Sequence, residues 1–305
     1  MRYFFFLFSI LHLFAVESPL QEILSALPGS SFHEVVLEKV GGGQTNQNYR
    51  ATIDAKTYFI RWSQINQESL GSSLEREWIC TAIASAAGLA PRVVSYFPEK
   101  RIMVSEFLKG ETSHRAFPLL IEGYCDLLRT LHVLDAKFPS IFCPFDCIQQ
   151  LIHYAKEVGA YLPSSLFEEV LPQVEFLQQT LSFRYPAVPC HLDLHSGNVI
   201  DTGHRLWLID WEYAAMGDPF FDLATLASAE HFQEHMMDHL LQVYLRRDPH
   251  PEERNYFHNM RFLADVRWAL WSYIQAAISP LEEPFEKYGD VFLKTAHKRG
   301  QDLQL

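Results

Sequence analysis

The feature that most limits the fold of this chain is a change of hydrophobic periodicity near residue 110. Before it, segments rich in aromatic and β-branched residues alternate with turns, which predicts strands at residues 35–40, 57–62, 92–96 and 101–105. A helix predicted over residues 72–87 interrupts them. After residue 110, apolar residues recur at three- and four-residue steps, which predicts helices. We therefore expect an α+β chain in two lobes, a small mainly β lobe followed by a larger mainly α lobe.

The composition argues against a nucleic-acid partner. The chain has 25 Lys and Arg against 37 Asp and Glu, a formal net charge of −12, whereas nucleic-acid binders normally carry a basic face. An acidic chain suits a cationic small ligand, although acidity also serves solubility. Of the five cysteines, Cys143 and Cys147 are four residues apart, but no second cysteine or histidine pair at metal-binding spacing accompanies them. We therefore expect reduced thiols that pack in the interior.

The strongest chemical signal is an ordered set of polar residues between positions 191 and 210. His191 and Asp193 come first, Asn198 follows the aspartate by five residues, and Asp210 follows twelve residues later. The apolar stretches that flank the turn at 201–203 predict a hairpin, which places Asn198 and Asp210 at neighbouring strand ends. Phosphoryl transfer needs such a set, because one aspartate accepts the proton of the attacking hydroxyl and oxygen ligands hold Mg²⁺ at the phosphates.

With these motifs in this order, residues 35–299 resemble the choline/ethanolamine kinase and aminoglycoside phosphotransferase group. That resemblance implies a protein-kinase-like fold and an ATP- and Mg²⁺-dependent phosphotransferase with an alcohol group as acceptor. It implies that Asp193 is the catalytic base and that Asn198 and Asp210 are the metal ligands. His191 would hold the loop by hydrogen bonds.

The resemblance also implies where the nucleotide binds. The glycines of segment 41–48 would let its backbone approach the phosphates. Arg61 stands where protein kinases place a phosphate-gripping lysine, so it counts with Asp193 as catalytic, and Glu77 or Glu75 would pair with it. The backbone of residues 106–108 would bind adenine. The expected nucleotide-binding residues are Gly42, Gly43, Thr45, Asn46, Arg61, Glu77, Glu106 and Leu108.

An aromatic motif bears on the acceptor. Trp268 and Trp271 are three residues apart, so they share one face of a predicted helix, and Tyr288 follows seventeen residues after Trp271. This segment resembles the C-terminal segment of choline kinases, which implies that these rings and Tyr213 enclose a quaternary ammonium. Ring faces attract such a cation by about 2 kcal/mol or more each when desolvated. Candidate counter-charges are Glu212, Asp222 and Glu230, of which Asp222 is expected rather to anchor the loop after Asp210.

The predicted acceptor is the primary hydroxyl of choline, and other acceptors stay open. Residues 193–198 and 209–214 resemble bacterial thiamine kinases at least as much, and thiamine is also a cation with a primary hydroxyl. Ethanolamine would favour carboxylates over rings, and a multi-amine aminoglycoside would favour a wider acidic cleft. An alternative from a different class is a catalytically silent binding protein of the same fold. The intact set of Asp193, Asn198 and Asp210 argues against it, and the role of His195 is open.

The expected domains are an apolar segment of uncertain role at 1–20, an N-lobe at 21–105 and a C-lobe at 106–305. The apolar run from Tyr3 to Val16 is shorter than the roughly 20 residues that cross a bilayer. With Arg2 before it, the run also resembles a secretory signal, but Leu13 stands where a cleavage site has a small residue. We expect a cytoplasmic enzyme, because its nucleotide is cytosolic; export or a weak membrane contact through the N-terminus stays open.

Overall fold

The computed structural model describes residues 24, 27, 35–40, 47–53, 55–63, 70–113, 120–301 and 303. The apolar N-terminal run and the glycine-rich loop at 41–46 lie outside the described residues. The chain forms two compact units, one from Met1–Ile65 and Arg92–Phe107 and the other from Asn66–Pro91 and Leu108–Leu305. Among the described residues, no helix combines the length and the apolar character that a bilayer span requires.

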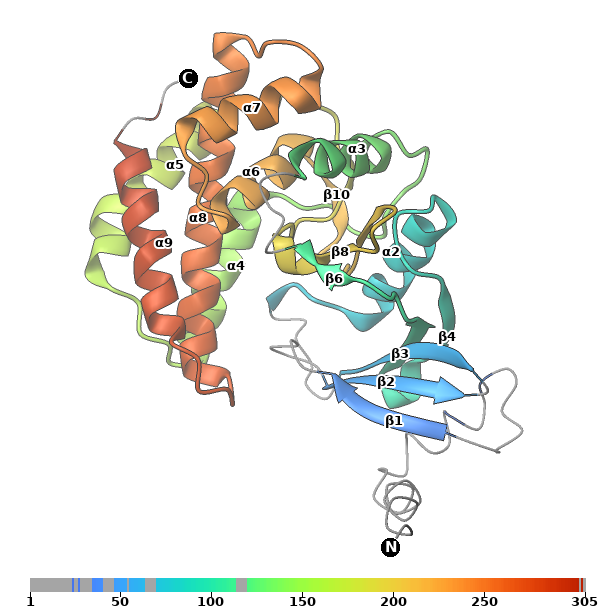
Figure 1. Cartoon of the computed structure of the whole chain (residues 1–305). Helices are drawn as coiled ribbons and strands as arrows, with labels where there is room; N and C mark the ends of the chain where they lie inside the picture. Colours follow the sequence, from blue (N-terminus) through green and yellow to red (C-terminus); the bar gives the residue numbers. More distant parts are fainter. Residues whose placement is uncertain are drawn as a thin grey trace, which may run out of the picture. The chain divides into compact units, whose positions relative to one another are not determined.

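The smaller unit is built on an antiparallel sheet, as the strand patterns predict. Its strand order is β1-β2-β3-β5-β4 (Figure 1). The left-handed backbone of Ala55, with φ of 64°, makes the turn between β2 and β3. The buried face carries Ala51, Ile60 and Val104, which are fully buried. The strands are β1 (Val35–Val40), β2 (Gln47–Ile53), β3 (Lys56–Trp62), β4 (Val93–Phe97) and β5 (Ile102–Glu106), with the short helix η2 (Pro98–Lys100) between the last two.

The larger unit is mainly helical. Its long helix α8 (Pro251–Ile278) packs against α4, α6 and α9 (Figure 1). Apolar residues lie on several sides of α8, as expected of a helix at the centre of a core. The other helices are α2 (Leu74–Ala86), α3 (Ile121–His132), α4 (Pro144–Glu157), η4 (Leu166–Val170), α5 (Leu171–Thr180), η5 (Ser196–Asn198), α6 (Pro219–Ala229), α7 (Glu234–Leu245) and α9 (Phe285–Gly300).

Two small sheets in this unit carry the polar motif. The strand β7 (Val188–Cys190) pairs with β10 (Ala215–Gly217), and β6 (Glu111–Thr112) pairs with β8 (Val199–Asp201), which pairs with β9 (Leu206–Leu208). The predicted hairpin is confirmed, because Val199 lies opposite Leu208 and Asp201 opposite Leu206. Gly110 is required beside it, since a Cβ there would lie 2.4 Å from the carbonyl oxygen of Asp201.

The helix α2 belongs to the larger unit, whereas the predicted lobes place it with the strands. Its Cys80 and Ala84 are fully buried in the core of the larger unit. Just beyond its end, Leu89 accepts a backbone hydrogen bond of 2.9 Å from Leu208 of the hairpin. All five cysteines are free thiols.

Candidate active site

The loop between β7 and β8 carries Asp193 and Asn198. The side-chain amide of Asn198 donates to the backbone oxygen of Asp193 at 2.9 Å and to its carboxylate Oδ2 at 3.1 Å. The carbonyl of Asn198 accepts from the N–H of Ile209 at 3.0 Å, one residue before Asp210. The hairpin therefore brings Asn198 beside the segment that ends in Asp210. With its amide nitrogen engaged in this way, the amide oxygen of Asn198 is the atom of this side chain that could bind a cation.

Two carboxylates, those of Asp193 and Asp210, act on each other electrostatically. Burial raises the pKa of Asp193, His195 and Arg267 lower it in part, and the charge of Asp210 raises it again. A divalent cation between such carboxylates would relieve the repulsion. Asp210 has a left-handed backbone, with φ of 65°, which is uncommon outside glycine and typical of functional loops. The donor set of carboxylate and amide oxygens fits Mg²⁺, a hard cation.

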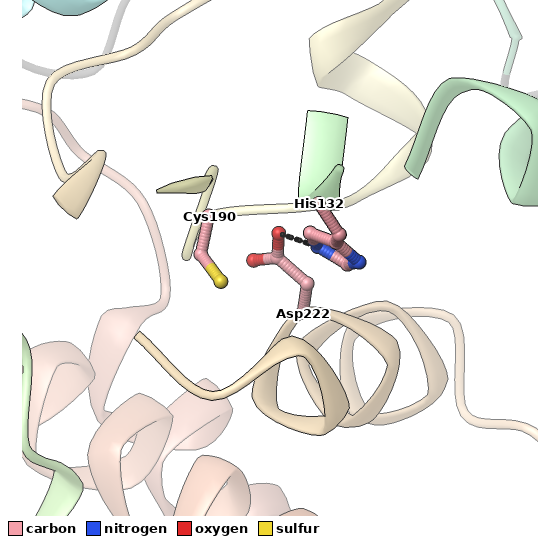
Figure 2. A group of neighbouring side chains, drawn as sticks. All are labelled: His132, Cys190 and Asp222. Atoms are coloured by element: carbon pink, nitrogen blue, oxygen red, sulfur yellow. Dashed lines mark hydrogen bonds and ion pairs between the residues drawn. The ribbon is translucent and has the colours of Figure 1, made fainter. Parts of the chain in front are cut away.

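A buried carboxylate in α6 anchors the loop before Asp193. Asp222 is fully buried, and its two oxygens accept from the backbone N–H groups of His191 at 2.8 Å and Leu192 at 2.6 Å. The same carboxylate lies 3.0 Å from Nε2 of His132 (Figure 2). Burial, the largest single cause, would raise the pKa of Asp222, but the hydrogen bonds and charges of His132 and His191 together outweigh it and lower that pKa. Asp222 thus holds the loop that leads into Asp193, rather than the loop after Asp210.

Figure 2 shows Asp222 between His132 and Cys190, three residue types that bind metals elsewhere. Here their donor atoms are already occupied. The other ring nitrogen of His132 pairs with the hydroxyl of Tyr244 at 2.7 Å, and Asp222 holds the loop backbone. Burial raises the pKa of Cys190 well above its ordinary value, which disfavours the thiolate form that binds metals. The cluster is a structural support of the loop.

Two histidines shape the same loop. Nε2 of His191 lies 2.9 Å from the carbonyl oxygen of Ile209, so its imidazole connects the loop to the segment before Asp210. Its ring also lies 4.8 Å from that of Trp211. These contacts fit the loop-holding role that the sequence predicts for His191. Nδ1 of His195 accepts from the N–H of Gly197 at 3.0 Å and caps η5.

Three of the four predicted aromatic residues meet beside this loop. The rings of Trp268 and Trp271 are 5.8 Å apart between centroids and nearly perpendicular. The indole N–H of Trp271 donates to the hydroxyl of Tyr213 at 3.2 Å. The ring of His195 lies 6.5 Å from that of Trp268, so the aromatic residues lie beside the loop between β7 and β8 that carries Asp193. These contacts lie entirely within the larger unit.

The fourth aromatic residue, Tyr288, lies further out. It reaches Trp271 through Phe285, whose ring is 6.0 Å from Trp271 and 6.2 Å from Tyr288. Tyr288 is 40 % exposed, and its hydroxyl donates to Glu283 at 3.3 Å. The sequence motif did not point to Phe285, nor to Phe292, whose ring stacks on Trp268 at 5.9 Å. Their spacing along α9 is the ordinary pattern of a packed helix, so no sequence signal set them apart.

The candidate counter-charges have partners of their own. Glu230 accepts from the N–H of Ser196 at 2.6 Å, so it supports the end of the catalytic loop as Asp222 supports its beginning. Glu212 is buried and accepts from the hydroxyl of Ser72 at 3.2 Å. Glu212 also raises the pKa of Tyr213, after burial, which is the larger cause. Glu212 is therefore the acid of the three that acts on the aromatic residues.

The predicted nucleotide residues are only partly described. Gly42, Gly43, Thr45 and Asn46 lie outside the described residues. Arg61 is buried in β3, opposite Asn48 of β2 and Met103 of β5. In α2, Glu77 is buried whereas Glu75 is exposed, so Glu77 is the acid that needs a partner.

The segment predicted to bind adenine begins at Glu106, the last residue of β5. The backbone N–H of Glu106 donates to Arg92 at 2.9 Å, and that of Phe107 donates to Thr57 at 3.1 Å. Since these two donors are engaged within the smaller unit, the N–H of Leu108 is the donor of this segment that adenine could use.

Comparison with known proteins identifies the family. Residues 36–257 match the Phosphotransferase enzyme family. The chain is 26 % identical over 272 residues to Protein LicA of Haemophilus influenzae, covering 86 % of this chain and 78 % of that protein. It is 25 % identical over 303 residues to a probable ethanolamine kinase of Arabidopsis thaliana, covering 85 % and 77 %. A crystal structure of choline kinase LicA from Streptococcus pneumoniae superposes with a TM-score of 0.76 at 25 % identity, covering 93 % of this chain and 100 % of the other.

These matches span both the strand region and the helical region, and they confirm the predicted family and the protein-kinase-like fold. The chain therefore belongs to the Phosphotransferase enzyme family, and it is a small-molecule kinase that transfers a phosphoryl group to an alcohol.

Proposed function

We propose that this protein uses ATP and Mg²⁺ to phosphorylate the primary hydroxyl of choline. The observation that carries the proposal is the contact between a phosphoryl-transfer loop and an aromatic cluster within one compact unit. The loop supplies Asp193 and Asn198, and the cluster supplies Trp268 and Trp271, with His195 between them. A cation bound at the rings would place a short hydroxyl arm near the loop.

Asp193 is the proposed general base. Its carboxylate would accept the hydroxyl proton as the substrate oxygen attacks the γ-phosphorus and ADP leaves. The Asn198 amide holds one oxygen of that carboxylate in place, which fixes its direction. Asn198 and Asp210 would hold Mg²⁺, which supplies charge neutralisation at the phosphates. Arg61 would grip the phosphate oxygens, and the Leu108 N–H would bind adenine.

The chemistry of the rings favours a quaternary ammonium over a primary amine. A primary ammonium has three N–H donors that need acceptors, whereas a trimethylammonium has none and gains from ring faces. Two of the acids near the site, Asp222 and Glu230, accept hydrogen bonds from the loop backbone, Asp222 with both oxygens and Glu230 with one. The site thus offers more ring surface than uncommitted carboxylate, which supports choline ahead of ethanolamine. The proteins similar to this chain include a choline kinase and a probable ethanolamine kinase, so family membership does not distinguish the two alcohols.

The test is an ATP-consumption assay with purified protein and four acceptors: choline, ethanolamine, thiamine and kanamycin. We expect the highest kcat/KM with choline. A higher kcat/KM with any of the other three would assign the acceptor differently while leaving the kinase intact. Mg-ATP binding without turnover of any acceptor would favour the catalytically silent binding protein.

A further inference from the structure

We propose that Arg267 is a positioning residue, which ties the aromatic cluster of α8 to the backbone of the catalytic loop. This inference rests on the proposed function, in which that loop presents Asp193 to the substrate. Arg267 immediately precedes Trp268 in the sequence, and nothing in the motif singles it out.

The first contact of Arg267 is with the loop itself. Its guanidinium Nη1 donates to the carbonyl oxygen of Leu192, the residue before Asp193. Leu192 is fully buried and has a left-handed backbone, with φ of 64°, which costs a non-glycine residue about 1 kcal/mol or more. A conformation of this kind persists only where its surroundings hold it. Asp222 holds the N–H of Leu192 and Arg267 holds its carbonyl, so the two side chains fix the peptide groups on both sides of this residue.

The second set of contacts is with aromatic rings. The guanidinium carbon of Arg267 lies 4.8 Å from the ring centroid of Tyr213, 5.8 Å from that of Trp268 and 5.9 Å from that of Phe142. An arginine can stack on rings and donate in its plane at the same time. Arg267 is therefore placed to hold Tyr213 and Trp268 in a fixed relation to the loop.

The charge of Arg267 lies in the interior of the larger unit. Arg267 is only 7 % exposed, and no ion pair within the described part of the chain includes it. A buried cation without an ion-pair partner is expensive, and here a backbone carbonyl, the Cys147 sulfur, ring faces and the charge of Asp193 compensate it. One side chain thus contacts both the backbone of the loop and the rings of Tyr213 and Trp268.

Arg261 offers a matched control. It lies on the same helix and is 2 % exposed, but its guanidinium contacts the sulfur of Met237 rather than the catalytic loop. Replacing either arginine by methionine removes a buried charge from α8. Only the change at Arg267 removes a contact with the loop.

The experiment compares Arg267→Met, Arg267→Lys and Arg261→Met in the full chain. We measure kcat and KM for choline and ATP, together with amide hydrogen exchange in the peptide covering residues 188–200. For Arg267→Met we expect faster exchange in that peptide and a kcat lowered roughly 10- to 100-fold per folded molecule, with the KM for ATP unchanged. Arg267→Lys, which keeps a charged donor, should recover most of the kcat. Arg261→Met should lower stability alone.

Unchanged exchange in residues 188–200 of Arg267→Met would overturn the proposal, whatever the activity. So would a kcat per folded molecule equal to that of Arg261→Met. If Arg267→Met does not fold, Arg267→Lys decides by the same exchange measurement, since a lysine ammonium lacks the planar fork of the guanidinium and should hold the loop less firmly. A wild-type protein that turns over none of the four acceptors would refute the proposed function, while the exchange would still decide whether Arg267 holds the loop.

Discussion

Replacing Asp222 by asparagine tests how the catalytic loop is held. The carboxylate is fully buried and interacts with three groups: the N–H of His191, the N–H of Leu192 and the ring of His132. Asparagine keeps the volume and one acceptor oxygen. It replaces the other oxygen by an NH₂ group. That group is itself a donor, so it would face an N–H group from which the carboxylate oxygen accepted a hydrogen bond.

The expected cost follows from these contacts. Hydrogen bonds to a charged group contribute about 1.5–3 kcal/mol each, and asparagine both loses such bonds and places a donor against an N–H group. We expect Asp222→Asn to lower the free energy of unfolding by about 3–5 kcal/mol. A domain with a stability of about 5–15 kcal/mol would then remain mostly folded at low temperature.

Urea unfolding at pH 7 measures the stability, and kcat per folded molecule reports whether the loop still positions Asp193. The matched control is Asp218→Asn at the start of the same helix, where the carboxylate accepts from the N–H of Phe220 and the hydroxyl of Tyr256. Both variants should be less stable, but only Asp222→Asn should also lower kcat. A loss below about 1 kcal/mol with full kcat would refute the reasoning that this buried carboxylate positions the loop.

Three further changes have distinct signatures. Trp271→Ala should raise the KM for choline by roughly 30-fold, the equivalent of about 2 kcal/mol, and leave the KM for ATP unchanged; equal effects on both would indicate packing alone. Asp210→Asn should weaken nucleotide binding only when Mg²⁺ is present, and calorimetric titration with and without the metal checks this. Hydrogen bonds from Arg247 lower the pKa of Glu253 to about 2, so its carboxylate stabilises the fold above pH of about 4.5 and loses this effect as the pH falls toward 2. Glu253→Gln should therefore have a lower free energy of unfolding than the wild type at pH 7, and this difference should narrow on acidification. A difference independent of pH would contradict the assigned role of the Glu253 carboxylate.

The local parts of the site could be predicted from the sequence. The hairpin that brings Asn198 beside the Asp210 segment depends on two short apolar runs and a turn, so its register follows from neighbouring residues. The shared face of Trp268 and Trp271 follows from helical spacing in the same way. The helix predicted at 72–87 is present as α2, within two residues at its start.

The long-range parts could not be predicted. The support of the catalytic loop joins His132, Asp222 and Arg267, and the first and last of these are 135 positions apart in the sequence. A histidine, an aspartate and an arginine at such separations carry no periodic pattern. The membership of α2 in the larger unit likewise depends on tertiary packing around Cys80 rather than on helix propensity. The glycine-rich loop and the pairing of Arg61 with Glu77 stay predictions.

The central claim is that Asp193 accepts the proton of the attacking alcohol, and Asp193→Asn tests it most directly. Phosphorus NMR of the reaction with Mg-ATP and choline follows phosphocholine itself rather than nucleotide loss. We expect product formation to fall by roughly two to four orders of magnitude, the usual contribution of a general base, in a variant that still unfolds cooperatively and binds Mg-ATP. Phosphocholine formation within about threefold of the wild-type rate would contradict the account, because a reaction that proceeds without this carboxylate does not use it as the base.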